Sequence, residues 1–145
     1  MEYACSAWDP FQANHIKKLE MVQRRAARFI KKEYSKQPGT VTNILSDLNL
    51  PTLESRRKVH RLCILHKAVH GQAAIRIPPT FHLRQNSSTR NYHPKKYINI
   101  NTSTNVYKNS FFPRSIKDWN DLPDHLLEIE DPKTFKKQLT IFMNM

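Results

Sequence analysis

Residues 14–34 constrain the fold of this chain more than any other segment, because their apolar side chains recur at helical spacing. Projected at about 100° per residue, one face of the segment is apolar and holds Ile16, Leu19, Val22, Ala26, Phe29 and Ile30. The opposite face is basic and holds Lys17, Arg24, Arg25, Arg28, Lys31 and Lys32. The pattern predicts an amphipathic helix, with Asn14 as its N-cap, that packs its apolar face against the rest of the protein.

Glycine and capping residues predict two more helices before residue 77. The Pro38-Gly39 pair ends the first helix, and a short helix is expected over residues 42–48. Thr52 is a good N-cap for a longer helix over residues 53–70, and Gly71 supplies its C-terminal stop.

The helical pattern weakens after residue 76. Pro78 and Pro79 prevent a helix from continuing, and the polar run 85–91 is typical of a long loop. One short strand is allowed over Tyr97, Ile98 and Ile100.

Order is expected to return at Ser110. Short helices are predicted over residues 115–120 and from Asp124 onward, and a final helix after Asp131, with Pro132 at its first position. The expected fold class is therefore mainly α: a small helical domain of four to six helices with a long irregular middle loop and at most one short strand or hairpin. The expected organisation is a basic helical region over residues 1–76, an irregular linker over 77–109 and a helical segment over 110–145.

The charge of the chain points to a polyanionic partner. Lys and Arg number 24 against 12 Asp and Glu, for a net charge of +12. Half of the acidic residues lie between Asp118 and Asp131. The rest of the chain therefore carries nearly all of the positive charge. Nucleic acid is the first expectation, and a solvated basic surface without a partner is the alternative. The residues expected on RNA or DNA phosphates are Lys17, Arg24, Arg25, Arg28, Lys31, Lys32, Arg56, Arg57 and Arg61.

Several other classes of function have no support in the composition. The chain has only two glycines, whereas phosphate-cradling loops need several. Cys5 and Cys63 form neither a disulfide framework nor a zinc module. His66 and His70 have helical i, i+4 spacing, but Lys67 stands where zinc motifs carry an acid. We therefore expect no catalytic residues, metal, cofactor or small-molecule substrate.

Aromatic side chains offer a further interpretation, as stacking platforms for unpaired bases. The candidates are Trp8, Phe111, Phe112 and Trp119. Core packing is the favoured interpretation for Phe112 and Trp119. No apolar run reaches the roughly 20 residues of a membrane helix, and the first residues lack the pattern of a signal peptide. An intracellular protein without a membrane partner is expected.

Three segments, in this order, resemble a known family. They are residues 3–10 (YACSAWDP) followed by 19–29 (LEMVQRRAARF), residues 48–57 (LNLPTLESRR) and residues 110–123 (SFFPRSIKDWNDLP). Together they resemble the region that follows the polymerase domain in jockey-like non-LTR (LINE-type) retrotransposon reverse transcriptases. The resemblance covers nearly the whole chain.

The resemblance implies a non-catalytic C-terminal fragment of an RNA-directed DNA polymerase, with the missing polymerase domains as partners. The fragment itself is not expected to be an enzyme, because no Asp-Asp or Asp-x-Asp pair is present to hold two catalytic metal ions. Its expected role is contact with the backbone of the template–product duplex, in nucleus and cytoplasm if the parent element is active. The alternatives are a protein-interaction module that docks on the parent domains and an inert relic of a truncated element.

Overall fold

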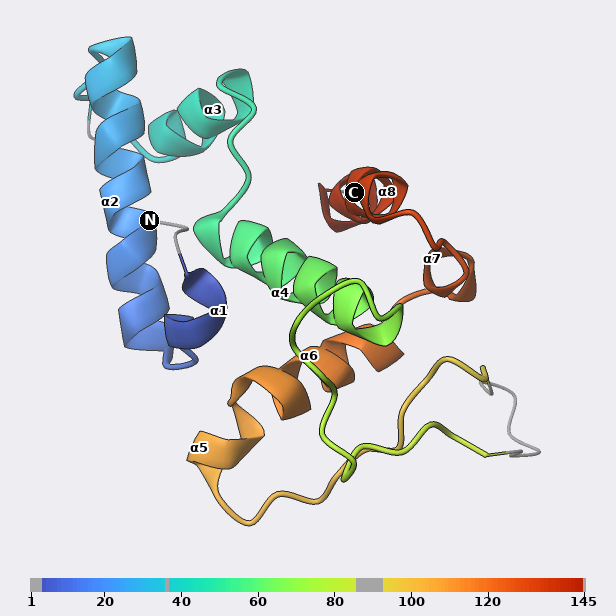
Figure 1. Cartoon of the computed structure of the whole chain (residues 1–145). Coiled ribbons are helices and arrows are strands. Elements are labelled where there is room, and N and C mark those ends of the chain that lie inside the picture. The colour runs from blue at the N-terminus through green and yellow to red at the C-terminus, as the bar shows by residue number, and fades with distance from the viewer. Residues whose placement is uncertain (1–3, 36, 86–92, 145) are drawn as a thin grey trace. The chain divides into compact units, whose positions relative to one another are not determined.

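A computed structural model of the chain describes residues 4–35, 37–85 and 93–144. The chain divides into two compact units, Met1–Arg57 and Lys58–Met145. Eight helices and one isolated bridge, between Leu83 and Tyr97, make up the regular structure of the described residues (Figure 1). The mainly α-helical class predicted from the sequence is confirmed. Three of the eight helices are single turns of four residues.

The first unit is built around one long helix. It contains α1 (Cys5–Trp8), α2 (Ala13–Lys31), α3 (Thr40–Asp47) and the first turn of α4 (Leu53–Val69). In Figure 1, α1 lies beside the N-terminal end of α2 and α3 beside its C-terminal half. Gly39, with φ 86°, precedes α3 in the left-handed conformation that glycine adopts without strain.

The long helix predicted over residues 14–34 is present, but it packs through a different face. Its buried residues are Gln23 and Ala27, whereas Phe29 is 74% exposed and Ile30 is 61% exposed. The buried stripe is rotated by about 70° from the predicted apolar face. The N-cap is Gln12, which makes no side-chain capping bond, and Asn14 lies inside the helix.

Polar anchors explain this rotation. The side-chain amide of Gln23 donates a hydrogen bond to the carbonyl oxygen of Pro51 at 2.9 Å. The carboxylate of Glu20 accepts one from the backbone N–H of Glu54, also at 2.9 Å. Glu20 therefore caps the start of α4, where a negative charge is favourable. These two bonds turn the polar stripe of α2 inward and leave its largest apolar side chains outside.

Both predicted ends of α4 are confirmed. The hydroxyl of Thr52 accepts a hydrogen bond from the backbone N–H of Ser55 at 3.1 Å. Gly71 follows the helix with φ 66°, the left-handed conformation in which helices commonly end.

The second unit contains the main hydrophobic core. Its helices are the remainder of α4, α5 (Asn105–Lys108), α6 (Phe111–Asn120), α7 (Asp124–Leu127) and α8 (Pro132–Asn144). The fully buried apolar side chains of this core are Leu62, Leu65, Trp119, Leu126, Leu127, Phe135 and Leu139. Burial of each Leu or Phe contributes about 1.5–3 kcal/mol, so this unit holds most of the hydrophobic stabilisation.

Residues 77–109, expected to form an irregular linker, contribute to this core. Phe81 and Tyr97 are buried in it, and the helix α5, which was not predicted, lies within the same stretch. The indole N–H of Trp119 donates a hydrogen bond to the carbonyl oxygen of Lys95 at 2.9 Å. The two compact units divide after Arg57, inside α4. The expected short strand is reduced to the single bridge at Tyr97, and residues 86–91 of the polar run lie outside the described residues.

Asp131 and prolines mark the starts of helices α8 and α6. The carboxylate of Asp131 accepts hydrogen bonds from the backbone N–H and the hydroxyl of Thr134, at 2.8 and 2.6 Å, and Pro132 is the first residue of α8. This confirms the predicted cap. Helix α6 begins four residues before the predicted start. Pro113 is its third residue, where an N–H would have no partner within the helix.

A buried histidine, His66, packs inside the second unit. The imidazole Nε2 of His66 lies 2.7 Å from the carbonyl oxygen of Ile129, so Nε2 carries the proton and donates. The ring stacks on Phe135 with centroids 4.1 Å apart, and its Nδ1 has no hydrogen-bond partner among the described residues. Burial is the main cause that lowers the pKa values of both His66 and His70.

We expect the free energy of unfolding to fall as the pH decreases from about 7 to 5. Both histidines have pKa values below the ordinary 6.5, so over this range the unfolded chain binds protons that the folded chain does not. Each can contribute at most about 1.4 kcal/mol per pH unit. Urea unfolding at several pH values measures the slope. The double variant His66→Gln, His70→Gln should flatten it, and an unchanged slope in that variant would contradict this assignment.

No helix within the described ranges is both long enough and apolar enough to span a bilayer.

Candidate nucleic-acid interface

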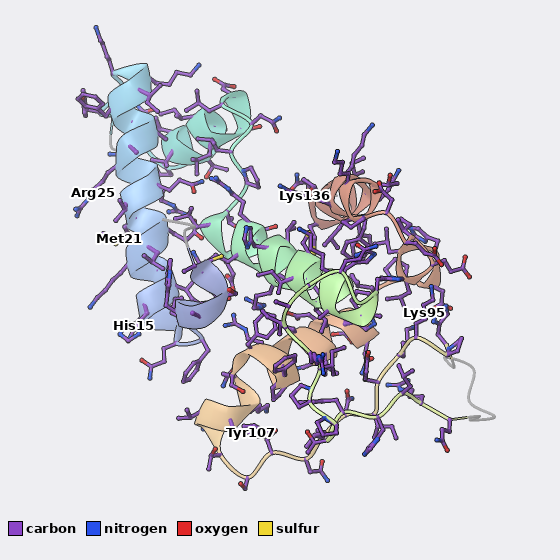
Figure 2. All side chains as sticks on the ribbon, in the orientation of Figure 1. His15, Met21, Arg25, Lys95, Tyr107 and Lys136 are labelled. Carbon is purple, nitrogen blue, oxygen red and sulfur yellow. The ribbon has the colours of Figure 1, made fainter. Side chains whose placement is uncertain are left out.

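Five of the nine basic residues predicted to contact phosphate share one face of α2: Lys17, Arg24, Arg25, Arg28 and Lys31. At about 100° per residue, these five fall within an arc of about 120°. All are exposed except Arg28, which is half-buried. From Lys17 to Lys31 the face extends over about 21 Å. Arg25 projects from α2 on the side away from α3 (Figure 2). Lys32 follows the helix as its C-cap residue, with φ 51°.

This face is poorly neutralised. Helix α2 contains six Lys or Arg and a single acid, Glu20, whose carboxylate is used at the start of α4. Within the described part of the chain, the only ion pair on the face joins Lys31 to Asp47, at 3.7 Å and with both side chains exposed. Exposed pairs of this kind contribute little. The face therefore presents a concentrated positive field.

Arg57 does not belong to this surface, which corrects the sequence prediction. It is fully buried in the first unit, and its Nε donates a hydrogen bond to the carboxylate of Asp9 at 2.6 Å. Arg56 is half-buried in the same turn of α4. A guanidinium that is removed from solvent and paired within the protein is not available to phosphate.

Arg61 is also an internal ion-pair residue and not a surface contact. Its Nη2 lies 2.8 Å from the carboxylate of Asp118. The same carboxylate forms an ion pair with the ammonium group of Lys58 at 3.1 Å. Asp9 and Asp118 stand 48 and 57 residues from their arginines. No local pattern could have revealed these pairs.

The acidic segment near the C-terminus is occupied by structural contacts. Besides the pairs at Asp118, the carboxylate of Asp124 accepts a hydrogen bond from the ammonium group of Lys96 at 2.9 Å. This bond lowers the pKa of Asp124, and the bonds from Thr134 lower the pKa of Asp131. The predicted helix-capping role is thus present at Asp131.

No metal centre or activated nucleophile emerges from the described residues. In residues 4–35, 37–85 and 93–144, no group of three or more His, Cys, Asp or Glu could hold a metal ion. Cys63 packs against the core of the second unit, and burial raises the pKa of its thiol. The raised pKa favours the neutral thiol, which is the less nucleophilic form.

The four aromatic candidates differ in how deeply they are buried. Trp119 is fully buried and Phe112 packs against the same core, so core packing is confirmed for both. Phe111 is half-buried and meets Phe112 edge to face. Trp8 is 42% exposed. Trp8 also lines a surface hollow of the first unit.

Comparisons with protein-family models, with curated proteins and with solved structures found no match to this chain.

Proposed function

We propose that this chain binds the backbone of nucleic acid, without sequence preference, through the basic face of α2. The observation that carries the proposal is the nearly unpaired row of basic residues on α2 and directly after it, which are exposed except for the half-buried Arg28: Lys17, Arg24, Arg25, Arg28, Lys31 and Lys32. Lys and Arg contacts to phosphate supply affinity and position but carry no sequence information. Arg56 is half-buried, so it can contribute only in part to phosphate binding.

We further propose that the chain is the non-catalytic C-terminal part of a jockey-like reverse transcriptase. The support is the order of the three sequence segments that resemble this family. In that setting, α2 would track the template–product duplex while the parent polymerase supplies the chemistry. The flanking genomic sequence tests the parentage: an upstream frame that encodes the palm carboxylates of a polymerase would support it, and an unrelated upstream frame would contradict it.

Binding should weaken steeply as salt concentration rises. Each neutralised phosphate releases condensed counterion, so about four phosphate contacts predict a log–log slope of about −3 to −4. Changing Arg24, Arg25 and Arg28 together to Gln should flatten the slope by about 2 to 3 units. None of the three is fully buried, so the fold should survive. Fluorescence anisotropy with a labelled RNA–DNA hybrid at several salt concentrations measures both slopes.

A matched variant separates the α2 face from total charge. Lys133, Lys136 and Lys137 are exposed on α8, and changing them to Gln removes the same formal charge. This control should change the slope by less than about 1 unit. Equal flattening in the two triple variants would contradict the assignment to α2.

The exposed apolar side chains of α2 favour a second candidate, a protein-interaction module. Val22, Phe29 and Ile30 are each more than 40% exposed on one side of the helix. Such a strip suits docking on missing parent domains. Absence of binding to the hybrid at low salt would favour this candidate over the first.

A further inference from the structure

A surface hollow beside the basic face of α2 combines an aromatic ring with two basic side chains. It has a volume of about 310 Å³ and is lined by Trp8 and Pro10 together with His15, Lys18 and Leu19 from the first turns of α2. Figure 2 shows His15 at the end of α2 beside α1. All five residues belong to the first unit.

The position of Trp8 is well anchored. The next residue, Asp9, is nearly buried and holds the buried Arg57 at 2.6 Å, and its backbone N–H donates a hydrogen bond to the carbonyl oxygen of Cys5 at 2.9 Å. The chain on one side of the indole is thereby fixed by an internal ion pair. A fixed backbone at Trp8 reduces the conformational entropy that is lost when its ring binds a flat ligand.

We propose that this hollow takes one unpaired base of a single-stranded nucleic acid, stacked on the indole of Trp8. Lys18, with His15 nearby, would contact the phosphates on either side of the base. This inference rests on the proposed function of α2 and adds a subsite for single strands to it. Base stacking on aromatic side chains tolerates any sequence, because every base has a π-face, and it therefore suits a binder without sequence preference.

Lys18, which lines the hollow, lies close to the row of basic residues on α2. Lys18 and Arg25 are seven residues apart and lie within about 20° of each other around α2. This spacing separates their attachment points by about 10 Å along the helix. A strand whose backbone follows α2 from Arg25 would reach Lys18 and then the hollow. Lys17, one residue away, belongs to the basic face itself.

The test compares two probes on the full chain: a short oligodeoxythymidylate and an abasic oligonucleotide of the same length. The two carry equal phosphate charge, so only stacking distinguishes them. The wild-type protein should bind the base-bearing probe about 5- to 150-fold more tightly. Trp8→Ala should bring the two affinities together, and Trp8→Phe should retain part of the preference.

Tryptophan fluorescence gives a second readout. The chain has two tryptophans, and Trp119 is fully buried. Binding of the base-bearing probe should quench the wild-type emission, whereas Trp8→Phe, which reports Trp119 alone, should not be quenched.

The outcomes separate this subsite from the function of α2. Equal affinity of the wild-type protein for both probes, or a preference that survives in Trp8→Ala, overturns the subsite and leaves the α2 proposal intact if the probes still bind with a steep salt slope. If neither probe binds at low salt, both the subsite and the α2 proposal are overturned.

Discussion

Replacing Phe135 by alanine is expected to lower the free energy of unfolding by about 3–5 kcal/mol. Phe135 is fully buried, its ring stacks on His66 and it also faces Trp119 at a centroid distance of 5.9 Å. Its removal would open a cavity at the centre of the second unit's core. Chemical denaturation followed by circular dichroism measures the change.

Phe29 provides the matched control. It is also a helical phenylalanine, and its sequence position predicted burial, but it is 74% exposed. Phe29→Ala should change the free energy of unfolding by no more than about 0.5 kcal/mol. If Phe29→Ala cost as much as Phe135→Ala, the orientation of α2 described above would be wrong.

Replacing Asp9 by asparagine is expected to cost about 3–5 kcal/mol. The substitution leaves the fully buried Arg57 without an anionic partner at Nε, and its two terminal nitrogens already have no hydrogen-bond partner among the described residues. A buried charge without compensation is one of the largest single penalties in a folded protein. Denaturation curves of the wild-type protein and the variant give the difference.

Two further variants test this cause. Asp47→Asn removes the partner of an exposed pair with Lys31 and should cost no more than about 1 kcal/mol. The double variant Asp9→Asn, Arg57→Met replaces the buried charge by an apolar side chain of similar length. It should recover part of the lost stability. No recovery would mean that Asp9 acts through contacts other than its ion pair.

The features predicted most accurately from sequence are those set by local chemistry. Thr52, Gly71 and Asp131 mark helix ends in the structure as the sequence predicted. Capping and left-handed turns depend on residues within one turn of each other, so they can be recognised in a sequence. The helices themselves follow from apolar periodicity in the same way.

The face through which α2 packs could not be predicted from the local sequence pattern. Hydrophobic periodicity favoured a face that includes Phe29, but the hydrogen bond from Gln23 to Pro51 and the capping of α4 by Glu20 select another. These bonds join residues 28 and 34 positions apart. The role of Phe81 in the core was missed for a related reason, because a single buried residue in an irregular segment has no period.

The candidate interface was predictable in part. The row from Lys17 to Lys32 is visible in the sequence as a one-sided basic pattern and remains exposed in the structure. Arg57 and Arg61 looked equivalent to these residues because charge alone does not reveal a distant acid. Long-range ion pairs of this kind become visible only in three dimensions.

Backbone amide chemical shifts during titration with an RNA–DNA hybrid test the central claim most directly. The account predicts that the largest shift changes fall on α2 and on Lys32, and that the amides of α8 change little although α8 also carries exposed lysines. Largest changes on α6 to α8, or no changes at low salt, would contradict binding through the basic face of α2.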